Sequence, residues 1–182
     1  MRAASANAWT GVQMLSVLFV TVLTAAGAQL SFPLPFTPVP FTIQPMIVLI
    51  GAAALGSRLG ALAQIFYLML GVAGLPVFAF SPELPQGIAR LMGPTGGYLI
   101  GFLPAVYLAG LLSGRCRSLW SLFGAFTVSC LIIHLSGWAQ LSALSGPAEA
   151  FRAGTLPFIF LDLLKAFLTA ALVQSVRSRR PS

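Results

Sequence analysis

The stretch that decides the fold is FIFLDLLKAF, residues 158–167. It lies inside an apolar run from about Leu156 to Val173, which is long enough to cross a bilayer as a helix. Asp162 and Lys165 are three residues apart within it, so on a helix they share one face and can offset each other's charge. Ionisable side chains are rare inside membrane-spanning helices, so this face must look into the protein.

Two interpretations of this charged pair are open. Asp162 and Lys165 could form a structural ion pair that locks the helices together, although a buried pair adds little net stability. They could instead form a ligand site, because they are the only acid and the only lysine in any hydrophobic segment. The carboxylate would then accept hydrogen bonds from N–H groups of a ligand, and the ammonium group would meet a carboxylate or a polarised carbonyl.

Composition places the chain among integral membrane proteins. Of its 182 residues, 58% are hydrophobic and only 7% are charged, against roughly 25% charged residues in a soluble domain. The net charge of +7 comes from basic residues scattered between apolar spans. That pattern is a topology signal, so nucleic-acid binding is not expected. The two cysteines predict neither a disulfide nor a metal framework.

The sequence predicts an all-α fold in a single membrane domain, residues 1–182, with six membrane-spanning helices. A glycine-containing break at 56–60 separates the second span from the third, and residues 142–155 are predicted to be a polar loop. The expected spans are residues 11–30, 43–56, 59–73, 95–112, 119–141 and 156–174.

The first span has a competing interpretation as a cleavable signal peptide. Arg2 precedes its apolar core, and Ala26-Gly27-Ala28 has the small-x-small form of a cleavage site. A membrane-spanning helix is favoured, because the run is long for a signal and its removal would leave an odd number of spans.

Small residues mark two expected helix contact faces. In the fourth span, Gly97 and Gly101 form a GxxxG pattern, which lets another helix approach closely. The first span carries two pairs of small residues at the same spacing of four: Thr21 with Ala25, and Thr24 with Ala28.

Two proline-rich connectors are unusually apolar. Residues 31–45, SFPLPFTPVPFTIQP, contain five prolines, which exclude a helix. We favour the interpretation that this apolar connector is a lid over a cavity. The alternative is a simple turn at the membrane interface. Residues 73–94 form a second irregular stretch, which carries Arg90 and is also amphiphilic. Two such lids on one side of the membrane predict a pocket between them.

Several other side chains are candidates for the pocket. Gln64 and Tyr67 lie one turn apart and could face a polar cavity or make interhelical hydrogen bonds. His134, in the fifth span, is favoured as a hydrogen-bonded packing residue over a ligand-binding one. The sequence shows no metal cluster, no catalytic set and no Walker A loop, so we expect no cofactor, and binding or transport ranks above catalysis. Apolar parts of a ligand would pack on Phe41, Phe78 or Phe80.

The basic residues predict the orientation of the chain. With six spans, seven arginines fall on one side, against two on the other. Both termini are therefore expected in the cytoplasm, with both lids outside. The seven are Arg2, Arg58, Arg115, Arg117, Arg177, Arg179 and Arg180, and the two are Arg90 and Arg152, which share their side with Glu83 and Glu149.

Four motifs resemble one family. They are TPVPFTIQ at Thr37–Gln44, GLPVFA at Gly74–Ala79, GPTGGYLIGF at Gly93–Phe102 and DLLK at Asp162–Lys165. In this order they closely resemble the BioY biotin transporters, and the resemblance runs from about Leu18 to the sixth span. The chain departs from many relatives at residues 80–86, FSPELPQ, where theirs are rich in glycine.

The resemblance implies a fold and a function. BioY proteins are six-helix substrate-binding (S) components of energy-coupling factor (ECF) transporters, and they capture biotin from outside the cell. For this chain, the resemblance implies high-affinity biotin binding and uptake across the bacterial cytoplasmic membrane. It also implies that Asp162 and Lys165 are essential for recognition of biotin. The candidate substrate-binding residues are Asp162, Lys165, Gln44, Thr42, Phe41, Gln64, Tyr67, Phe78, Phe80, Arg90 and Tyr98.

The resemblance also implies partners. The chain has no ATPase loop and no duplicated halves, so its energy must come from other subunits. We expect a transmembrane coupling subunit and a pair of ATP-binding-cassette (ABC) ATPases, and a homo-oligomer is a further arrangement that the sequence allows. The small residues of the first span, Thr21, Ala25, Thr24 and Ala28, are expected to contact the coupling subunit.

Two other functions are alternatives. An S component for a different vitamin would have the same architecture. A membrane enzyme would use Asp162, His134 and Lys165, and it would alter its ligand, whereas a binding component returns it unchanged.

Overall fold

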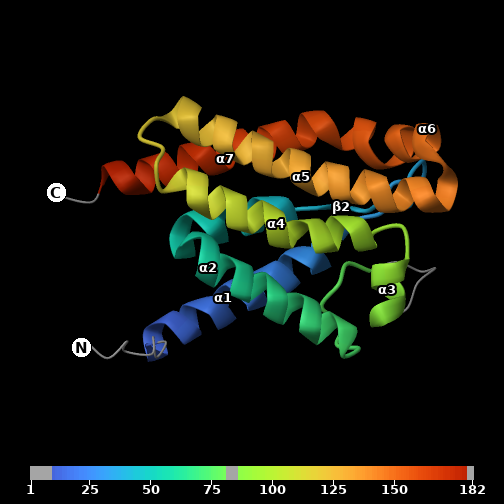
Figure 1. Cartoon of the computed structure of the whole chain (residues 1–182), viewed down its shortest axis with the longest axis horizontal. Coiled ribbons are helices and arrows are strands. Elements are labelled where there is room, and N and C mark those ends of the chain that lie inside the picture. Colours follow the sequence, from blue (N-terminus) through green and yellow to red (C-terminus); the bar gives the residue numbers. More distant parts are fainter. Residues whose placement is uncertain (1–9, 81–85, 180–182) are drawn as a thin grey trace, which may run out of the picture.

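The computed structural model describes residues 10–80 and 86–179, which are nearly all helical (Figure 1). Arg2, Glu83 and Arg180, which entered the charge tally, lie outside the described residues. The helices are α1 (Gly11–Gln29), α2 (Gln44–Val72), α3 (Ile88–Met92), α4 (Gly96–Ser113), α5 (Leu119–Ser145), α6 (Pro147–Ala150), the π-helix η1 (Phe151–Thr155) and α7 (Leu156–Ser178), and two short strands, β1 (Ser31–Phe32) and β2 (Phe41–Thr42), pair antiparallel.

The helix α2 is broken into two arms at Gly56. This residue has φ 77° and ψ −179°, a conformation that only glycine adopts readily. A Cβ atom on Gly60 would lie 3.5 Å from the Cα of Ala52, whereas eight residues of continuous helix span roughly 12 Å. The two arms therefore fold back against each other (Figure 1). Five described helices are long and apolar enough to cross a membrane, and the break in α2 supplies the sixth arm, which confirms the predicted six-helix fold.

The predicted polar loop at residues 142–155 is wrong, because nearly all of it is helical. The helix α5 continues to Ser145, and α6 and η1 lead directly into α7. Gly146, with φ 83°, is the single residue that separates α5 from α6. Pro147 then begins α6, where the N–H group that proline lacks would have no helical partner.

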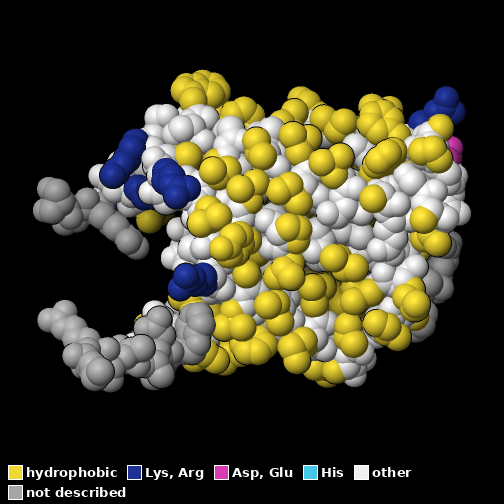
Figure 2. Space-filling view, viewed as in Figure 1, with side chains coloured by type: hydrophobic (Ala, Val, Ile, Leu, Met, Phe, Trp, Pro, Cys, Tyr) yellow, Lys and Arg dark blue, Asp and Glu magenta, His cyan; other side chains and the backbone are white. Residues whose placement is uncertain are grey.

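The surface of the molecule is that of a membrane protein. Figure 2 shows hydrophobic side chains over the middle of the visible face, while arginine side chains gather mainly at the end where both termini emerge. Large apolar residues such as Trp120 and Phe160 are 70% and 75% exposed. A soluble protein rarely exposes apolar surface on this scale. The chain is a multi-pass membrane protein.

The helix α4 lies at the centre of the bundle and packs against both α2 and α5 (Figure 1). The predicted GxxxG face makes the second of these contacts. A Cβ atom on Gly97 would lie 3.0 Å from the Cα of Gly137, and one on Gly101 would lie 3.2 Å from the Cα of Ile133. The absence of side chains at these glycines lets the two backbones approach closely enough to bring their cavity-lining residues together.

Three of the four small residues of α1 that were expected to meet a partner are already buried within the chain. Thr21, Thr24 and Ala28 are buried. The Thr21 hydroxyl donates to the carbonyl of Ala63 at 2.9 Å, and the Thr24 hydroxyl accepts from the amide of Gln64 at 3.3 Å. The helix that approaches this face is therefore α2 of the same chain. Ala25, the fourth expected docking residue, is partly buried against the core. Contact of this face with a partner subunit stays a prediction.

Candidate functional site

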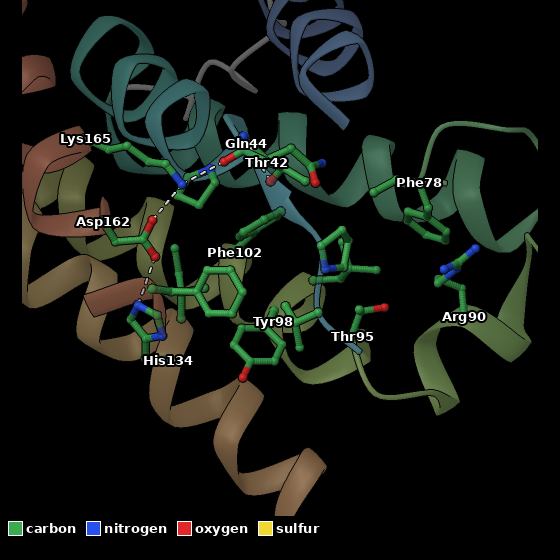
Figure 3. A pocket seen from close by; sticks show the side chains of 17 residues that line it. Thr42, Gln44, Phe78, Arg90, Thr95, Tyr98, Phe102, His134, Asp162 and Lys165 are labelled. Carbon is green, nitrogen blue, oxygen red and sulfur yellow. Dashed lines mark hydrogen bonds and ion pairs between the residues drawn. The ribbon is translucent and has the colours of Figure 1, made fainter. Parts of the chain in front are cut away.

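A cavity lies among the two proline-rich segments and helices α2, α3, α4, α5 and α7 (Figure 3). It is amphiphilic, with polar groups at both ends and apolar walls between them. The polar lining residues are Thr42, Gln44, Arg90, Thr95, Tyr98, His134, Asp162 and Lys165, and the apolar ones are Val39, Pro40, Pro45, Phe78, Ala79, Leu99, Phe102, Ile133 and Phe158.

One end of the cavity is a charged cluster centred on Asp162. Both of its carboxylate oxygens are in contact with nitrogen atoms: Oδ1 lies 2.7 Å from Nζ of Lys165, and Oδ2 lies 2.9 Å from Nε2 of His134. All three residues are at most 8% exposed. Because two helices, α5 and α7, supply these contacts, the carboxylate is held in a fixed orientation at the cavity wall.

Lys165 ties this cluster to the first proline-rich segment. Its ammonium group donates to the carbonyl of Thr42 at 2.7 Å and lies 4.0 Å from the ring centre of Phe41. An ammonium group has three donors, and the hydrogen bonds to Asp162 and Thr42 use two of them. The third can serve a ligand carbonyl or carboxylate.

The opposite end of the cavity carries Arg90 and Thr95 (Figure 3). The side-chain amide of Gln140, on α5, donates to the carbonyls of Leu91 and Gly93 at 2.7 and 2.8 Å. These two bonds hold the short helix α3, and with it Arg90, against the bundle. Burial lowers the pKa of the Arg90 guanidinium from its usual value, but arginine keeps its charge in proteins.

The segment around Phe78 closes one side of the cavity. Phe78 and the side chain of Gln86 make a reciprocal pair of hydrogen bonds, in which the Phe78 N–H donates at 3.2 Å and its carbonyl accepts at 3.3 Å. The Phe78 ring packs edge-on against Tyr67, with centres 5.5 Å apart, and lies against Gly71. These contacts fix an apolar wall.

Tyr98 forms part of the wall between α4 and α5. Its hydroxyl donates to the carbonyl of Gly154 in η1 at 2.7 Å, and its ring lies directly against Gly137. Its ring also packs edge-on towards His134, with centres 6.4 Å apart. The π-helix therefore has a structural role at the site, because its Gly154 carbonyl orients a lining residue.

Gly137→Ala is expected to destabilise the protein. A methyl group there would overlap the ring of Tyr98, and overpacking of this kind costs about 1–3 kcal/mol. Thermal unfolding of the purified protein in detergent measures the effect as a lower midpoint. Gly124→Ala is the matched control on the same helix, since a Cβ atom there meets nothing within 4 Å. Equal midpoints for the two variants would contradict the close packing of Tyr98 on α5.

The cavity brings together seven of the eleven predicted substrate-binding residues: Thr42, Gln44, Phe78, Arg90, Tyr98, Asp162 and Lys165. Phe41 lies beside Lys165 but is not among the lining residues.

Three predicted residues lie elsewhere. Gln64 and Tyr67 are fully buried behind the cavity. The Gln64 amide donates to Thr24 of α1 at 3.3 Å, so the interhelical alternative holds for Gln64. The Tyr67 hydroxyl accepts from Gln44, in the other arm of α2, at 2.7 Å. Phe80 is 69% exposed and lines a separate outer hollow.

Sequence reasoning did not assign His134 to the site. It favoured a packing residue, whereas the structure places the imidazole on the cavity wall in contact with Asp162. The available signal was that this is the single histidine of the chain and that it lies inside an apolar helix, where a titratable group marks function. Thr95, Leu99 and Phe102 were also missed as lining residues.

The first proline-rich segment is a lid. Pairing of β1 with β2 joins Ser31 to Thr42 and closes the segment into a loop. Val39, Pro40 and Thr42 all line the cavity. This geometry favours the lid interpretation over a simple interfacial turn.

The model of the BioY family matches residues 3–182. The chain belongs to the BioY family. The probable biotin transporter BioY of Pyrococcus horikoshii is 44% identical over 159 residues, which cover 87% of this chain and 91% of the relative. The biotin transporter BioY of Thermotoga maritima is 36% identical over 162 residues, or 88% and 92% of the two chains.

A solved structure agrees with the BioY assignment. The crystal structure of the S-component for biotin from an ECF-type ABC transporter superposes with a TM-score of 0.84 at 25% sequence identity. The superposition covers 97% of this chain and 96% of that chain. The BioY motifs therefore occur here on the fold of a known S component.

Proposed function

We propose that this BioY-family chain binds biotin outside the cell and acts as the substrate-specific component of an ECF-type ABC transporter. The proposal rests on the ion pair of Asp162 and Lys165, two buried side chains that lie at the wall of an amphiphilic cavity. A pair with a purely structural role has no need of an adjoining hollow.

The cavity supports a definite orientation of biotin. The ureido ring has N–H donors for the carboxylate of Asp162 and a carbonyl acceptor for Lys165. The fused rings and the aliphatic chain would lie along the apolar wall, which includes Leu99 and Phe102. The carboxylate of biotin would then reach Arg90, whose planar guanidinium matches a carboxylate through two hydrogen bonds.

The distribution of charge supports the orientation proposed from the sequence. Arginine side chains gather mainly at the end where the termini emerge (Figure 2), so that end faces the cytoplasm of the cell and the cavity with its lids faces outward. Energy comes from a transmembrane coupling subunit and ABC ATPases, because the chain itself carries no ATP-binding loop.

Isothermal titration calorimetry of the purified chain tests the proposal. Biotin is expected to bind at one site, while thiamine and riboflavin neither bind nor compete. Binding of either of these vitamins in place of biotin would replace the proposal with an S component of different specificity. Mass spectrometry of ligand released by denaturation is expected to recover unchanged biotin, as befits a protein that is not an enzyme.

Arg90→Met is expected to weaken biotin binding through the loss of a charge-assisted contact with the ligand carboxylate, worth about 1.5–3 kcal/mol. The same variant should bind biotin methyl ester nearly as well as the wild type does, because the ester lacks the negative charge. Competition against labelled biotin measures both. Arg152→Met, at an exposed arginine, is the matched control. An equal loss for biotin and its ester would contradict a contact between Arg90 and the carboxylate.

A further inference from the structure

His134 occupies the polar end of the cavity on the far side of Asp162 from Lys165 (Figure 3). We propose that it is a specificity-determining residue, in which Nε2 orients the Asp162 carboxylate and Nδ1 accepts a hydrogen bond from one ureido N–H of the ligand. The inference rests on the proposed function and adds to it a second ureido contact that neither Asp162 nor Lys165 can supply.

The contact with Asp162 decides which nitrogen of the imidazole carries a proton. Nε2 lies 2.9 Å from Oδ2, and an ionised carboxylate only accepts hydrogen bonds. The hydrogen therefore belongs on Nε2. In a neutral imidazole the other nitrogen, Nδ1, is then an acceptor.

The ring lies beside a pair whose charges already balance. Asp162 already has a counter-charge in Lys165, 2.7 Å away. The other titratable side chains near the ring are Tyr98, which faces it from α4, and Cys130, one turn earlier on α5, and neither brings a negative charge at neutral pH.

The acceptor Nδ1 is buried without a partner in the part of the chain that the structure describes. Nε2 likewise makes no well-aligned hydrogen bond among residues 10–80 and 86–179, but it alone lies close to a carboxylate oxygen. His134 is 7% exposed and lines the cavity. Figure 3 shows the second ring nitrogen on the side of the ring away from Asp162, towards Tyr98. A buried acceptor without a partner is unfavourable, and a ligand N–H removes that penalty.

The three polar groups together match the ureido ring. A ureido group presents a carbonyl oxygen flanked by two N–H donors. Lys165 supplies a donor for the carbonyl, while Asp162 and His134 supply one acceptor for each N–H. Because a site that pairs every polar group rejects analogues that lack one, His134 would make binding depend on the second N–H.

The test compares two substitutions that separate the two ring nitrogens. His134→Asn places an amide oxygen near the position of Nδ1, whereas His134→Gln places an amide nitrogen near Nε2 and offers no acceptor in place of Nδ1. The ligands are biotin and its two analogues with one or the other ureido nitrogen methylated. Leu135→Ala, at a residue that is 61% exposed on the same helix, is the control.

In the wild type, both methylated analogues are expected to bind at least about tenfold more weakly than biotin. His134→Gln should weaken the binding of biotin by about tenfold. It should also remove the affinity loss caused by methylation for one analogue only, the one methylated at the nitrogen that would face Nδ1. His134→Asn should keep most of the affinity for biotin, and both methylated analogues should still bind it more weakly than biotin does. Thermal unfolding in detergent checks that each variant folds, and should one variant fail, the other still carries the comparison with both analogues.

Two results would overturn the inference. If His134→Gln binds biotin like the wild type, or loses affinity while both analogue penalties stay unchanged, the residue has only a structural role and the proposed function stands. If the wild type itself binds no biotin, the proposed function fails and this inference fails with it.

Discussion

Asp162→Asn abolishes measurable biotin binding by a protein that still folds: this is the result we expect. The asparagine keeps the shape of the side chain but removes the negative charge that accepts from His134, Lys165 and the ligand. Hydrogen bonds to charged groups are each worth about 1.5–3 kcal/mol, so losing one to the ligand and disturbing two others should weaken binding at least a hundredfold. Titration calorimetry in detergent measures the loss.

The control for this variant is Glu149→Gln. Glu149 is exposed and lines the outer hollow, so this substitution removes one acid without touching the cavity. It should bind biotin like the wild type. Size-exclusion chromatography of Asp162→Asn should show the wild-type profile. Tight biotin binding by a folded Asp162→Asn protein would remove Asp162 from the recognition site.

Lys165→Ala is the second substitution with a large expected effect. It removes the donor proposed for the ureido carbonyl, and it breaks a buried pair, which costs about 3–5 kcal/mol when one partner is left alone. Because a hydrogen bond to a charged group is worth about 1.5–3 kcal/mol, biotin affinity should fall by about one to two orders of magnitude. The thermal midpoint in detergent should also fall, because the pair is broken.

The double variant Asp162→Asn with Lys165→Met separates a ligand site from a structural lock. Replacing both members of a buried pair with neutral groups is often neutral or stabilising. The double variant should therefore unfold at a midpoint near that of the wild type while binding no biotin. A midpoint as low as that of Lys165→Ala would support the structural interpretation of the pair.

The cavity could be predicted from the sequence to the extent that local spacing determines it. Asp162 and Lys165 share a helix face because they are three residues apart, and the cost of a charge in lipid turns that face inward. The apolar character of residues 31–45 indicated a lid, because a linker exposed to water is normally polar. The packing of Gly97 and Gly101 followed from the same kind of argument.

The errors arise where the sequence does not name the partner. Spacing showed that a helix approaches Thr21 and Thr24 closely, but not that this helix is α2 of the same chain. The spacing of Gln64 and Tyr67 is also found in residues that face a cavity. The way α2 folds back places both side chains behind the cavity, and the sequence does not show this.

Two further elements depended on contacts across the bundle. His134 reaches Asp162 because the glycines of α4 let α5 pack closely against it. No local sequence pattern indicates this contact. Residues 142–155 have the composition of a loop, yet they stay helical because Tyr98 and the core hold Gly154 and its neighbours in place.

The structure of the purified chain with biotin bound tests the central claim most directly. We expect biotin in the cavity, with its ureido ring within hydrogen-bonding distance of Asp162 and Lys165 and its carboxylate beside Arg90. Biotin bound elsewhere on the protein, or a cavity whose charged pair makes no contact with the ligand, would contradict the account.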